Sequence, residues 1–525
     1  HPVEVVLKTG VKKDGTLTAR QCKFIIDNGA YTDYGELLGI GVWDLFAGTY
    51  RVQNVSYEVR VVYTNTPAGG AYRGFGNPQL SFARESQMDI IAEALNMDPV
   101  ELRLKNAVET GDLKASGWEI RSCGLKECVT KVAEGIGWKE KHGKKRVSGT
   151  KMRGVGIACG EHWSCWRGGY NTNIWRTGYA TPEQLYKADP SSPHITVGTD
   201  GKVRWRPGFE MGPYDADPSS CVLIVNEDGT VNLHVSDVDR GQGSHTAFGI
   251  IAAEELGVPL EDVNVKGVDT DVGAYSPGTY ASRATYVCGN AVRNAANQAK
   301  TTLFKFASEM LEAPPEELKA AEGRIFVKDS PERFVRIADA AFRAYATRDG
   351  GHIIVKGYYD PDSVLLNPGT GEGAVSAAWL YFAQASEVEV DVETGEVKIL
   401  NVISAHDAGT VVNPIGAEGQ AEGAVAQGAG YALSEELTME EGRVLNPNFL
   451  RYIIPSTSSM PNVKTSFVDT YEPKGPFGAK GLGEPGLVAV APSVANAVNA
   501  AVGVRICELP ITPEKVLWAL QSKKP

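Results

Sequence analysis

The chain has 525 residues, 42% hydrophobic and 22% charged, as in a globular protein of one to four domains. Its net charge of −12 argues against a nucleic-acid partner, because phosphate binding relies on a basic face. No apolar run reaches the roughly 18 residues of a membrane span, and the eight cysteines include no Cys-x-x-Cys pair, so zinc-ribbon and iron–sulfur spacings are excluded.

One local pattern recurs along the chain: a strand, an acidic or Thr-Gly turn, and a returning strand. It occupies residues 5–24, 195–205, 222–235 and 388–402. Asp-Gly between alternating apolar residues is the strongest short-range signal for a β-hairpin. The sequence therefore predicts four hairpins.

Helices are predicted between these hairpins. Asn77-Pro78 opens one of them, and Asp98 before Pro99 caps another. Three more are predicted at 243–257, 419–437 and 491–503. Hairpins that alternate with helices predict an α+β fold.

The predicted elements also suggest how the chain is divided. Two hairpin–loop–helix units, near 219–300 and 386–437, form an internal pseudo-repeat of sheet and helix units. The polar, basic segment 107–152 carries one weak helix and is interpreted as a linker. We therefore expect a first domain over residues 1–150, ending in the linker helix, and a second over 151–525.

Five glycine-rich loops each lead into a predicted helix start, at residues 69–79, 239–246, 276–291, 406–420 and 475–486. Helix N-termini present unpaired N–H groups and a partial positive charge, so they attract anions. Any one of these loops alone is more simply a glycine turn with a helix cap. Their recurrence favours a shared ligand such as a long phosphorylated cofactor.

These loops also carry a resemblance. GGAYRGFGNPQ, GQGSHT, GTYASRATYVCGNA, NPIGAEGQAEGAVAQG and GAKGLGEPG match, in order and over essentially the whole chain, the molybdopterin-binding catalytic subunit of the xanthine oxidase (molybdenum hydroxylase) family. The resemblance implies molybdenum bound to molybdopterin, in the cytosine dinucleotide form usual in bacteria, with no protein ligand to the metal. It also implies a reaction in which a Mo–OH oxygen attacks an electron-poor carbon of an aromatic, N-heterocyclic or aldehyde substrate while hydride passes to Mo=S.

The resemblance assigns roles to individual residues. Glu484 matches the catalytic base, Arg73 the arginine beside the cofactor, and Phe75 the aromatic residue that stacks on substrate. Outside this motif Glu484 would be a surface acid, and Phe75 an ordinary core aromatic. Burial beside the metal is expected to raise the pKa of Glu484. The positions that cradle the pterin dinucleotide are Gln242, Gly243, Ser244, Ser282, Arg283, Gly409, Asn413, Gln420, Lys480, Gly481, Leu482 and Gly483.

The chain departs from the family pattern in three ways. The N-terminal domain and the GGGFGxK loop that contacts the molybdenum oxo group are not in this sequence, so we expect a second molybdopterin-binding chain to supply them, unless the sequence is a fragment of a longer chain. The position of the copper-binding cysteine of carbon monoxide dehydrogenases is Gly74, which argues against that chemistry. The position of a substrate-binding arginine in purine oxidases is Gly41, which disfavours xanthine.

Partners and alternatives follow from the same resemblance. Electrons would leave through [2Fe–2S] clusters on a partner subunit, often on to FAD in a third, and the scattered thiols fit the cytoplasm. The aromatic-rich stretch 161–220 is expected either to line a substrate funnel or to fill a subunit interface. The alternatives are an enzyme like 4-hydroxybenzoyl-CoA reductase, which removes a ring hydroxyl, and a non-catalytic subunit that only holds the cofactor.

Overall fold

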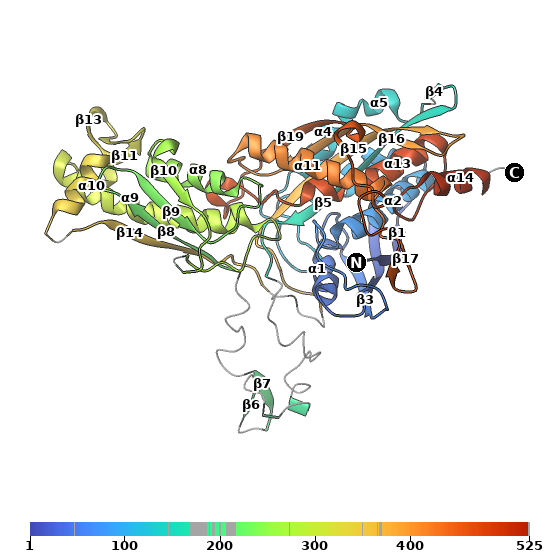
Figure 1. Ribbon diagram of the computed structural model, residues 1–525, viewed down its shortest axis with the longest axis horizontal. Helices are drawn as coiled ribbons and strands as arrows, with labels where there is room; N and C mark the ends of the chain where they lie inside the picture. Colours follow the sequence, from blue (N-terminus) through green and yellow to red (C-terminus); the bar gives the residue numbers. More distant parts are fainter. Residues whose placement is uncertain are drawn as a thin grey trace.

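The computed structural model describes residues 1–46, 48–144, 146–167, 186–187, 190–191, 195–198, 201–205, 217–271, 273–348, 350–364, 366 and 370–522. Three larger bodies of strands and helices lie side by side in Figure 1. The β1–β3 sheet and its helices lie next to the sheet that contains β15 and β16. The sheet that contains β8 and β9 forms the opposite end of the molecule.

The first body is a small unit built in the order strand, strand, helix, strand, helix. Strand β2 runs antiparallel to β1 and parallel to β3. The parallel pairing requires a crossover connection, which helix α1 provides. Its elements are β1 (Val3–Val11), β2 (Leu17–Asp27), α1 (Gly35–Phe46), β3 (Asn54–Val62) and α2 (Asn77–Leu95).

The second body repeats this order. Strand β9 is antiparallel to β8 and parallel to β10, with α8 as the crossover, and β14 (Ile353–Tyr359) adds to the other edge of β8. A turn of π-helix, Ala284–Cys288, leads into α9. The elements of this unit are β8 (Ser219–Val225), β9 (Val231–Val235), α8 (Ser244–Leu256), β10 (Val263–Lys266) and α9 (Gly289–Leu311).

The third body repeats the order again. Strand β16 is antiparallel to β15 and parallel to β19, and β5 (Lys151–Trp163) pairs with the other edge of β15. The elements are β15 (Trp379–Asp391), β16 (Val397–Asp407), α11 (Pro414–Leu433), β19 (Asn462–Val468) and α13 (Val490–Val502). The predicted α+β fold with an internal repeat is therefore confirmed, and the structure adds a third copy, residues 3–95, that was not predicted.

The remaining elements connect or extend these bodies. The helices are α3 (Pro99–Asn106), α4 (Leu125–Ile136), α5 (Trp138–Lys141), α10 (Ile337–Ala346), α12 (Pro485–Val488) and α14 (Pro513–Ser522). The short 3₁₀ turns are η1 (Leu260–Asp262), η3 (Pro315–Glu317), η4 (Thr457–Ser459) and η5 (Pro476–Gly478). The strands are β4 (Arg146–Ser148), β6 (Ile195–Val197), β7 (Val203–Trp205), β11 (Leu318–Ala321), β12 (Arg324–Val327), β13 (Ser330–Arg336), β17 (Met439–Glu440) and β18 (Arg443–Val444).

The segment predicted as a linker contributes to the core. Helix α4 buries an apolar face that includes Leu125, Val129 and Val132, and this helix packs against β15 and β16. Residues 125–136 are therefore part of a packed layer rather than an exposed connection. The domain boundary near residue 150 stays a prediction.

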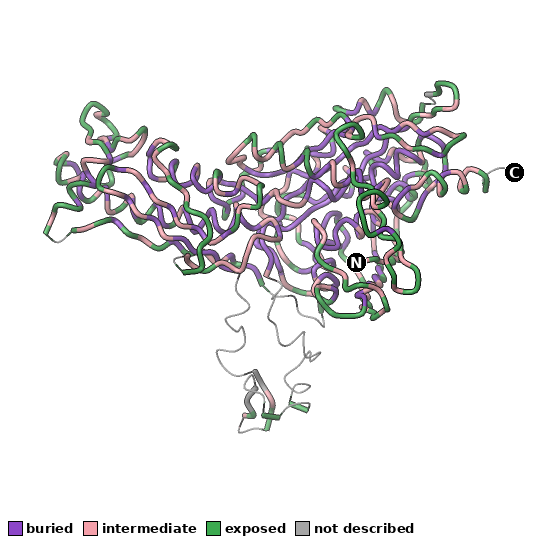
Figure 2. The backbone as a smooth tube through the Cα atoms, in the orientation of Figure 1, coloured by how far each residue is buried: buried purple, intermediate pink, exposed green. Residues whose placement is uncertain are grey.

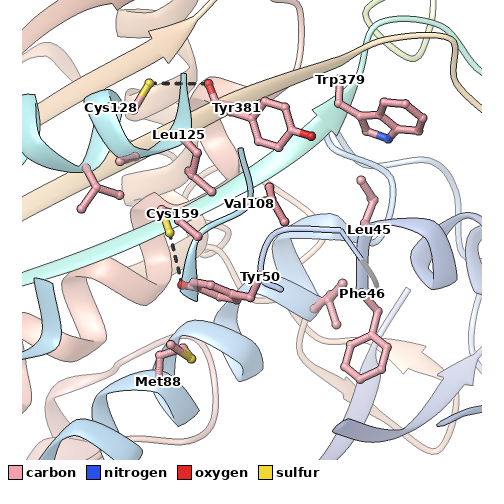
Figure 3. Close-up of a cluster of buried hydrophobic side chains, with 14 of the residues drawn as sticks. Leu45, Phe46, Tyr50, Met88, Val108, Leu125, Cys128, Cys159, Trp379 and Tyr381 are labelled. Carbon is pink, nitrogen blue, oxygen red and sulfur yellow. Dashed lines mark hydrogen bonds between the residues drawn. The ribbon is translucent and has the colours of Figure 1, made fainter. Parts of the chain in front are cut away.

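The largest hydrophobic core joins the first and third bodies. Figure 3 shows side chains of α1, α2, α4, β5 and β15 meeting in one cluster. The Tyr50 hydroxyl contacts Cys159 Sγ of β5 at 3.2 Å and donates to both carboxylate oxygens of Glu85, the nearer at 2.9 Å. Buried residues run through the interior of all three bodies, and exposed residues lie on their outer surfaces and in outlying loops (Figure 2).

One stretch does reach the length expected of a membrane span. The 18 residues Pro485–Val502 have a mean hydropathy of 1.3, but 89% of this stretch is buried inside the fold. Helix α13 in this stretch packs on β5 and β15. The apolar character of the stretch is thus explained by core packing.

Candidate functional site

All five predicted loops contribute to one cavity of about 620 Å³, a size typical of cofactor and ligand sites. The cavity lies where loops from the three repeated units meet. Twelve of the residues predicted from the sequence line it: Arg73, Gln242, Gly243, Ser244, Ser282, Arg283, Asn413, Gln420, Lys480, Leu482, Gly483 and Glu484.

The described lining contains a single carboxylate, that of Glu484, beside Arg73 and Arg240. The N-terminal turns of α8 and α11 also open onto the cavity, at Ser244 and at Asn413. Helix N-termini carry partial positive charge. The cavity therefore suits a ligand with anionic groups.

Glu484 lies directly before Pro485, the first residue of α12, and its side chain is 17% exposed. One carboxylate oxygen, Oε1, accepts from the backbone N–H of Gly74 at 3.3 Å. The other, Oε2, lies 2.8 Å from His162 Nε2 and accepts from the Ser282 hydroxyl at 3.2 Å. Three separate segments thus orient this side chain toward the cavity that it lines.

The predicted rise in the pKa of Glu484 is wrong. Burial does oppose its charge, but His162, the Gly74 N–H and the Arg73 guanidinium outweigh burial and hold the pKa of Glu484 below its ordinary value. Hydrogen bonds to a carboxylate favour its charged form. The site therefore favours an ionised acid, ready to accept a proton.

Ser282 is held in position by an unusual backbone. Ala281 and Ser282 both adopt left-handed conformations, with φ of 47° and 55°, which cost free energy in residues other than glycine. The Ser282 hydroxyl accepts from the Glu484 backbone N–H at 3.0 Å, so its own proton is directed to the Glu484 carboxylate. This strain fixes the contact between the third and fifth loops.

Arg73 joins three of the loops. Its Nε donates to the carbonyl of Gly483 at 2.7 Å, and its Nη2 donates to Gln420 Oε1 at 3.0 Å. Burial lowers the pKa of Arg73, against the attraction of Glu484. Its guanidinium has no carboxylate within ion-pairing distance among the described residues, so Arg73 contributes a positive charge to the cavity wall that only the more distant carboxylate of Glu484 attracts.

The other two predicted basic residues, Arg283 and Lys480, form buried ion pairs with aspartates. The Arg283 side chain is fully buried and pairs with Asp217 at 2.8 Å and Asp237 at 3.0 Å. The Lys480 ammonium is also fully buried and lies 2.7 Å from Asp407. Both residues border the cavity, but their charges anchor their loops.

The polar residues of the second and fourth loops mainly shape those loops. Gln242 accepts from the Arg240 N–H at 2.6 Å and donates to the Val238 carbonyl at 2.9 Å. Its amide also donates to the Ser244 hydroxyl. Asn413 caps α11 by accepting from the Gly416 N–H at 3.1 Å. These contacts fix the backbone around the helix N-termini that open onto the cavity.

Three predicted residues do not line the cavity. Phe75 is 8% exposed and packs against Trp166 and Tyr34, with ring centroids 5.2 Å and 6.0 Å away. Gly409 forms a β-bridge with Ala479. A Cβ on Gly481 would lie 1.9 Å from the Ser282 carbonyl oxygen, so this glycine allows the third and fifth loops to touch.

His162 is a site residue that was not predicted. It lies near the end of β5, 322 residues before Glu484 in sequence, and its side chain is completely buried. A single histidine in a strand is more often a core residue than a functional one, so no local motif marks it. Only the fold brings it to the carboxylate.

The comparisons with known proteins agree with this geometry. Family models described as the molybdopterin cofactor-binding domain match residues 131–461 and 1–107. A putative xanthine dehydrogenase molybdenum-binding subunit of Escherichia coli strain K12 is 32% identical over 98% of this chain and 62% of its own length.

Two solved structures share the fold. Aldehyde oxidoreductase from Desulfovibrio gigas has a TM-score of 0.77 and 27% identity, over 99% of this chain and 49% of that one. Quinoline 2-oxidoreductase from Pseudomonas putida 86 has a TM-score of 0.83 and 24% identity, over 100% of this chain and 62% of that one. The chain thus spans between about half and two thirds of the proteins that it matches.

Proposed function

The chain belongs to the molybdopterin-binding subunits of the xanthine oxidase family, and from this premise we propose that it is the catalytic part of a multi-chain molybdenum oxidoreductase. We propose as its reaction the oxidative hydroxylation of an aromatic, N-heterocyclic or aldehyde substrate. The observation that carries the proposal is the carboxylate of Glu484 in a cavity whose other described lining residues are cationic or neutral.

The cavity residues fit molybdenum bound to a pterin dinucleotide. A Cβ at Gly241 or Gly243 would meet no protein atom within 4 Å, so the backbone of this loop is open to close approach by a ligand. Arg73, Arg240 and the N-termini of α8 and α11 offer positive charge for phosphate groups. We propose that these elements, with the backbone of 480–483, hold the cofactor in its cytosine dinucleotide form.

The bound cofactor would supply the redox chemistry and the oxygen that reaches the substrate carbon. The contribution of this chain is to hold and move a proton. Glu484 Oε2 is occupied by His162 and Ser282, whereas Oε1 has only the longer contact to Gly74. We infer that Oε1 is the atom that accepts the proton of the attacking oxygen.

A cluster of four aromatic side chains includes Phe75 of the first loop, and none of the four is part of the cavity lining. Phe75 belongs to a cluster with Tyr34, Trp166 and Trp163, whose rings lie within 6.0 Å of a neighbour in the cluster. A Cβ at Gly41 would lie 2.7 Å from the Trp163 ring, so Trp163 blocks the space that a side chain at position 41 would need. The stretch 168–185 of the expected substrate funnel lies outside the described residues.

Gly74 argues separately against carbon monoxide chemistry. It has a φ of 95°, and a Cβ there would lie 2.9 Å from Pro78. A cysteine at this position would therefore be strained as well as crowded. We do not propose a copper site in this loop.

The partner chains remain proposals. The relative named above is itself a subunit by name, which supports an assembly of several chains. We propose that a second molybdopterin-binding segment completes the site, that electrons pass to [2Fe–2S] clusters and then to FAD on partner subunits, and that the assembly works in the cytoplasm.

The test is Glu484→Gln in the native complex, assayed with benzaldehyde, quinoline and xanthine and a dye as electron acceptor. Removing a positioned base should lower turnover by about a thousandfold while molybdenum content, measured by mass spectrometry, is unchanged. Glu472→Gln is the matched control, because Glu472 is 1% exposed and does not line the cavity. Unchanged turnover of Glu484→Gln would favour the non-catalytic alternative, and loss of molybdenum would give Glu484 a structural role.

A further inference from the structure

A buried chain of hydrogen bonds among residues that do not line the cavity leads to Glu484. It starts at Arg84 on α2, whose guanidinium is completely buried and can only donate. Arg84 Nη2 donates to Ser81 Oγ at 3.0 Å. The Ser81 hydroxyl is therefore free to direct its proton to Asn77 Oδ1, also 3.0 Å away.

Asn77, the first residue of α2, is the next residue of this hydrogen-bond chain, and its amide accepts a hydrogen bond on one side and donates on the other. Because its Oδ1 accepts from Ser81, its amide nitrogen faces the other way. That nitrogen donates to the backbone carbonyl of Glu161 at 2.7 Å and lies 3.3 Å from His162 Nδ1. A carbonyl oxygen can only accept, so the orientation of the amide is fixed at both ends.

The orientation of Asn77 decides the tautomer of His162. Since an NH₂ group faces Nδ1, that nitrogen must be the acceptor, and in a neutral ring the proton then sits on Nε2. His162 Nε2 lies 2.8 Å from Glu484 Oε2. Every group from Arg84 onward thus donates toward the carboxylate.

We propose that the chain Arg84–Ser81–Asn77–His162 fixes His162 as a neutral Nε2–H donor and so holds Glu484 ionised and correctly turned. His162 is a positioning residue that acts through Glu484. This inference deepens the proposed function and, for its effect on catalysis, rests on it. A second proton on His162 would have to sit on Nδ1, against the Asn77 amide, so His162 is a donor and not a proton relay.

The titratable and charged groups around this contact are few. The neutral ring of His162 from β5 and the guanidinium of Arg73 from the loop before α2 face Glu484. Behind His162, the carboxylate of Glu161 turns to Lys114, at 3.0 Å. Among described residues lining the cavity, no second carboxylate competes for the proton of His162.

The first test reads the tautomer directly and needs no turnover. The full chain is labelled with [¹⁵N]histidine, and the signal of His162, one of eight histidines, is assigned by its loss in His162→Phe. We expect the nitrogen shifts of an unprotonated Nδ1 and a protonated Nε2. A protonated Nδ1 would overturn the proposal.

The second test reads the effect on Glu484 through the pH profile of kcat/KM. Removing a donor raises the pKa of a carboxylate, so more Glu484 is protonated at low pH and activity is lost there. On the acidic side of the profile (the acid limb), we expect the pH at which kcat/KM falls to half of its maximum to be about one unit higher in His162→Phe than in the wild type. His162→Gln, which keeps an N–H donor, should move it less, and Ser81→Ala should also give a smaller rise.

These outcomes separate the two proposals. A complex that is inactive on every substrate but shows the expected ¹⁵N pattern contradicts the proposed function and leaves the hydrogen-bond chain standing. An active complex whose acid limb is the same in wild type and His162→Phe contradicts the role of His162 and leaves the function standing. If His162→Phe does not fold, His162→Gln supplies both readouts.

Discussion

The first of the three repeated units differs from the other two at one corresponding place. In the second and third units an aspartate at the end of the second strand pairs with a basic residue in the loop before the second helix. These pairs are Asp237 with Arg283, at 3.0 Å, and Asp407 with Lys480, at 2.7 Å. All four side chains are completely buried.

In the first unit the corresponding pair is separated. Asp27, the last residue of β2, accepts from the Gly29 N–H and from the Thr64 hydroxyl. Arg73, in the loop before α2, instead reaches Gly483 and Gln420 at the cavity. Two copies of the same arrangement therefore use their basic residue as an anchor, and the third places it in the wall of the cavity.

The largest expected effect that tests this difference is on folding stability. Arg283→Met would leave Asp217 and Asp237 buried without their cation, and breaking a buried ion pair by removing one partner costs about 3–5 kcal/mol. Because two buried carboxylates would be left without a cation, we expect a loss of about 5 kcal/mol in the free energy of unfolding, measured by urea denaturation of the chain.

Arg73→Met is the matched control in the first unit. It removes hydrogen bonds from a half-buried side chain and strands no buried carboxylate, so the loss should be about 1 kcal/mol. Its main effect should be weaker retention of molybdenum. Equal stability losses for the two variants would show that Arg73 is also a structural anchor, and the contrast between the units would fail.

A smaller loss is expected in the third unit. Lys480→Met leaves one buried carboxylate without a cation, so we expect the free energy of unfolding to fall by about 3 kcal/mol. Adding Asp407→Asn removes the unpaired charge, while the amide oxygen can still accept from the Gly124 N–H, now at 2.7 Å. The double variant should therefore be more stable than Lys480→Met alone. A double variant that is less stable would show that Asp407 stabilises the fold independently of Lys480.

The sequence predicted much of this site because its signals are local. Hairpin turns, helix caps and glycine loops are properties of neighbouring residues, so the five loops and Glu484 were found before the fold. The first repeated unit was not predicted because α1 contains three glycines, Gly35, Gly39 and Gly41. Glycine is a poor helix former, so these residues obscure the helical pattern in the sequence. Its repeat is visible only in how the strands pair.

What could not be predicted depends on contacts between distant segments. The pKa of Glu484 was expected to rise because burial and repulsion by an electron-rich metal centre were considered, whereas its donors come from β5, the loop before α2 and the third loop. Likewise, the ion pairs that occupy the positive charges of Arg283 and Lys480 were not predicted. Their aspartate partners are between 46 and 73 residues away in sequence.

The smallest expected effect concerns how the loops reach positive φ. The loop of the first unit has positive φ at Gly74, Phe75 and Gly76, two of them glycines, whereas the loop of the second has two successive non-glycine residues with positive φ, Ala281 and Ser282. Ala281→Gly relieves a strain of about 1 kcal/mol and adds a similar entropy to the unfolded chain, so stability should change by less than about 0.5 kcal/mol. Ala291→Gly, at a buried position inside α9, should cost about 1 kcal/mol, because glycine is a poor helix former. If both variants lose the same stability in urea denaturation, Ala281 is not strained, and the position of Ser282 beside Glu484 must come from packing alone.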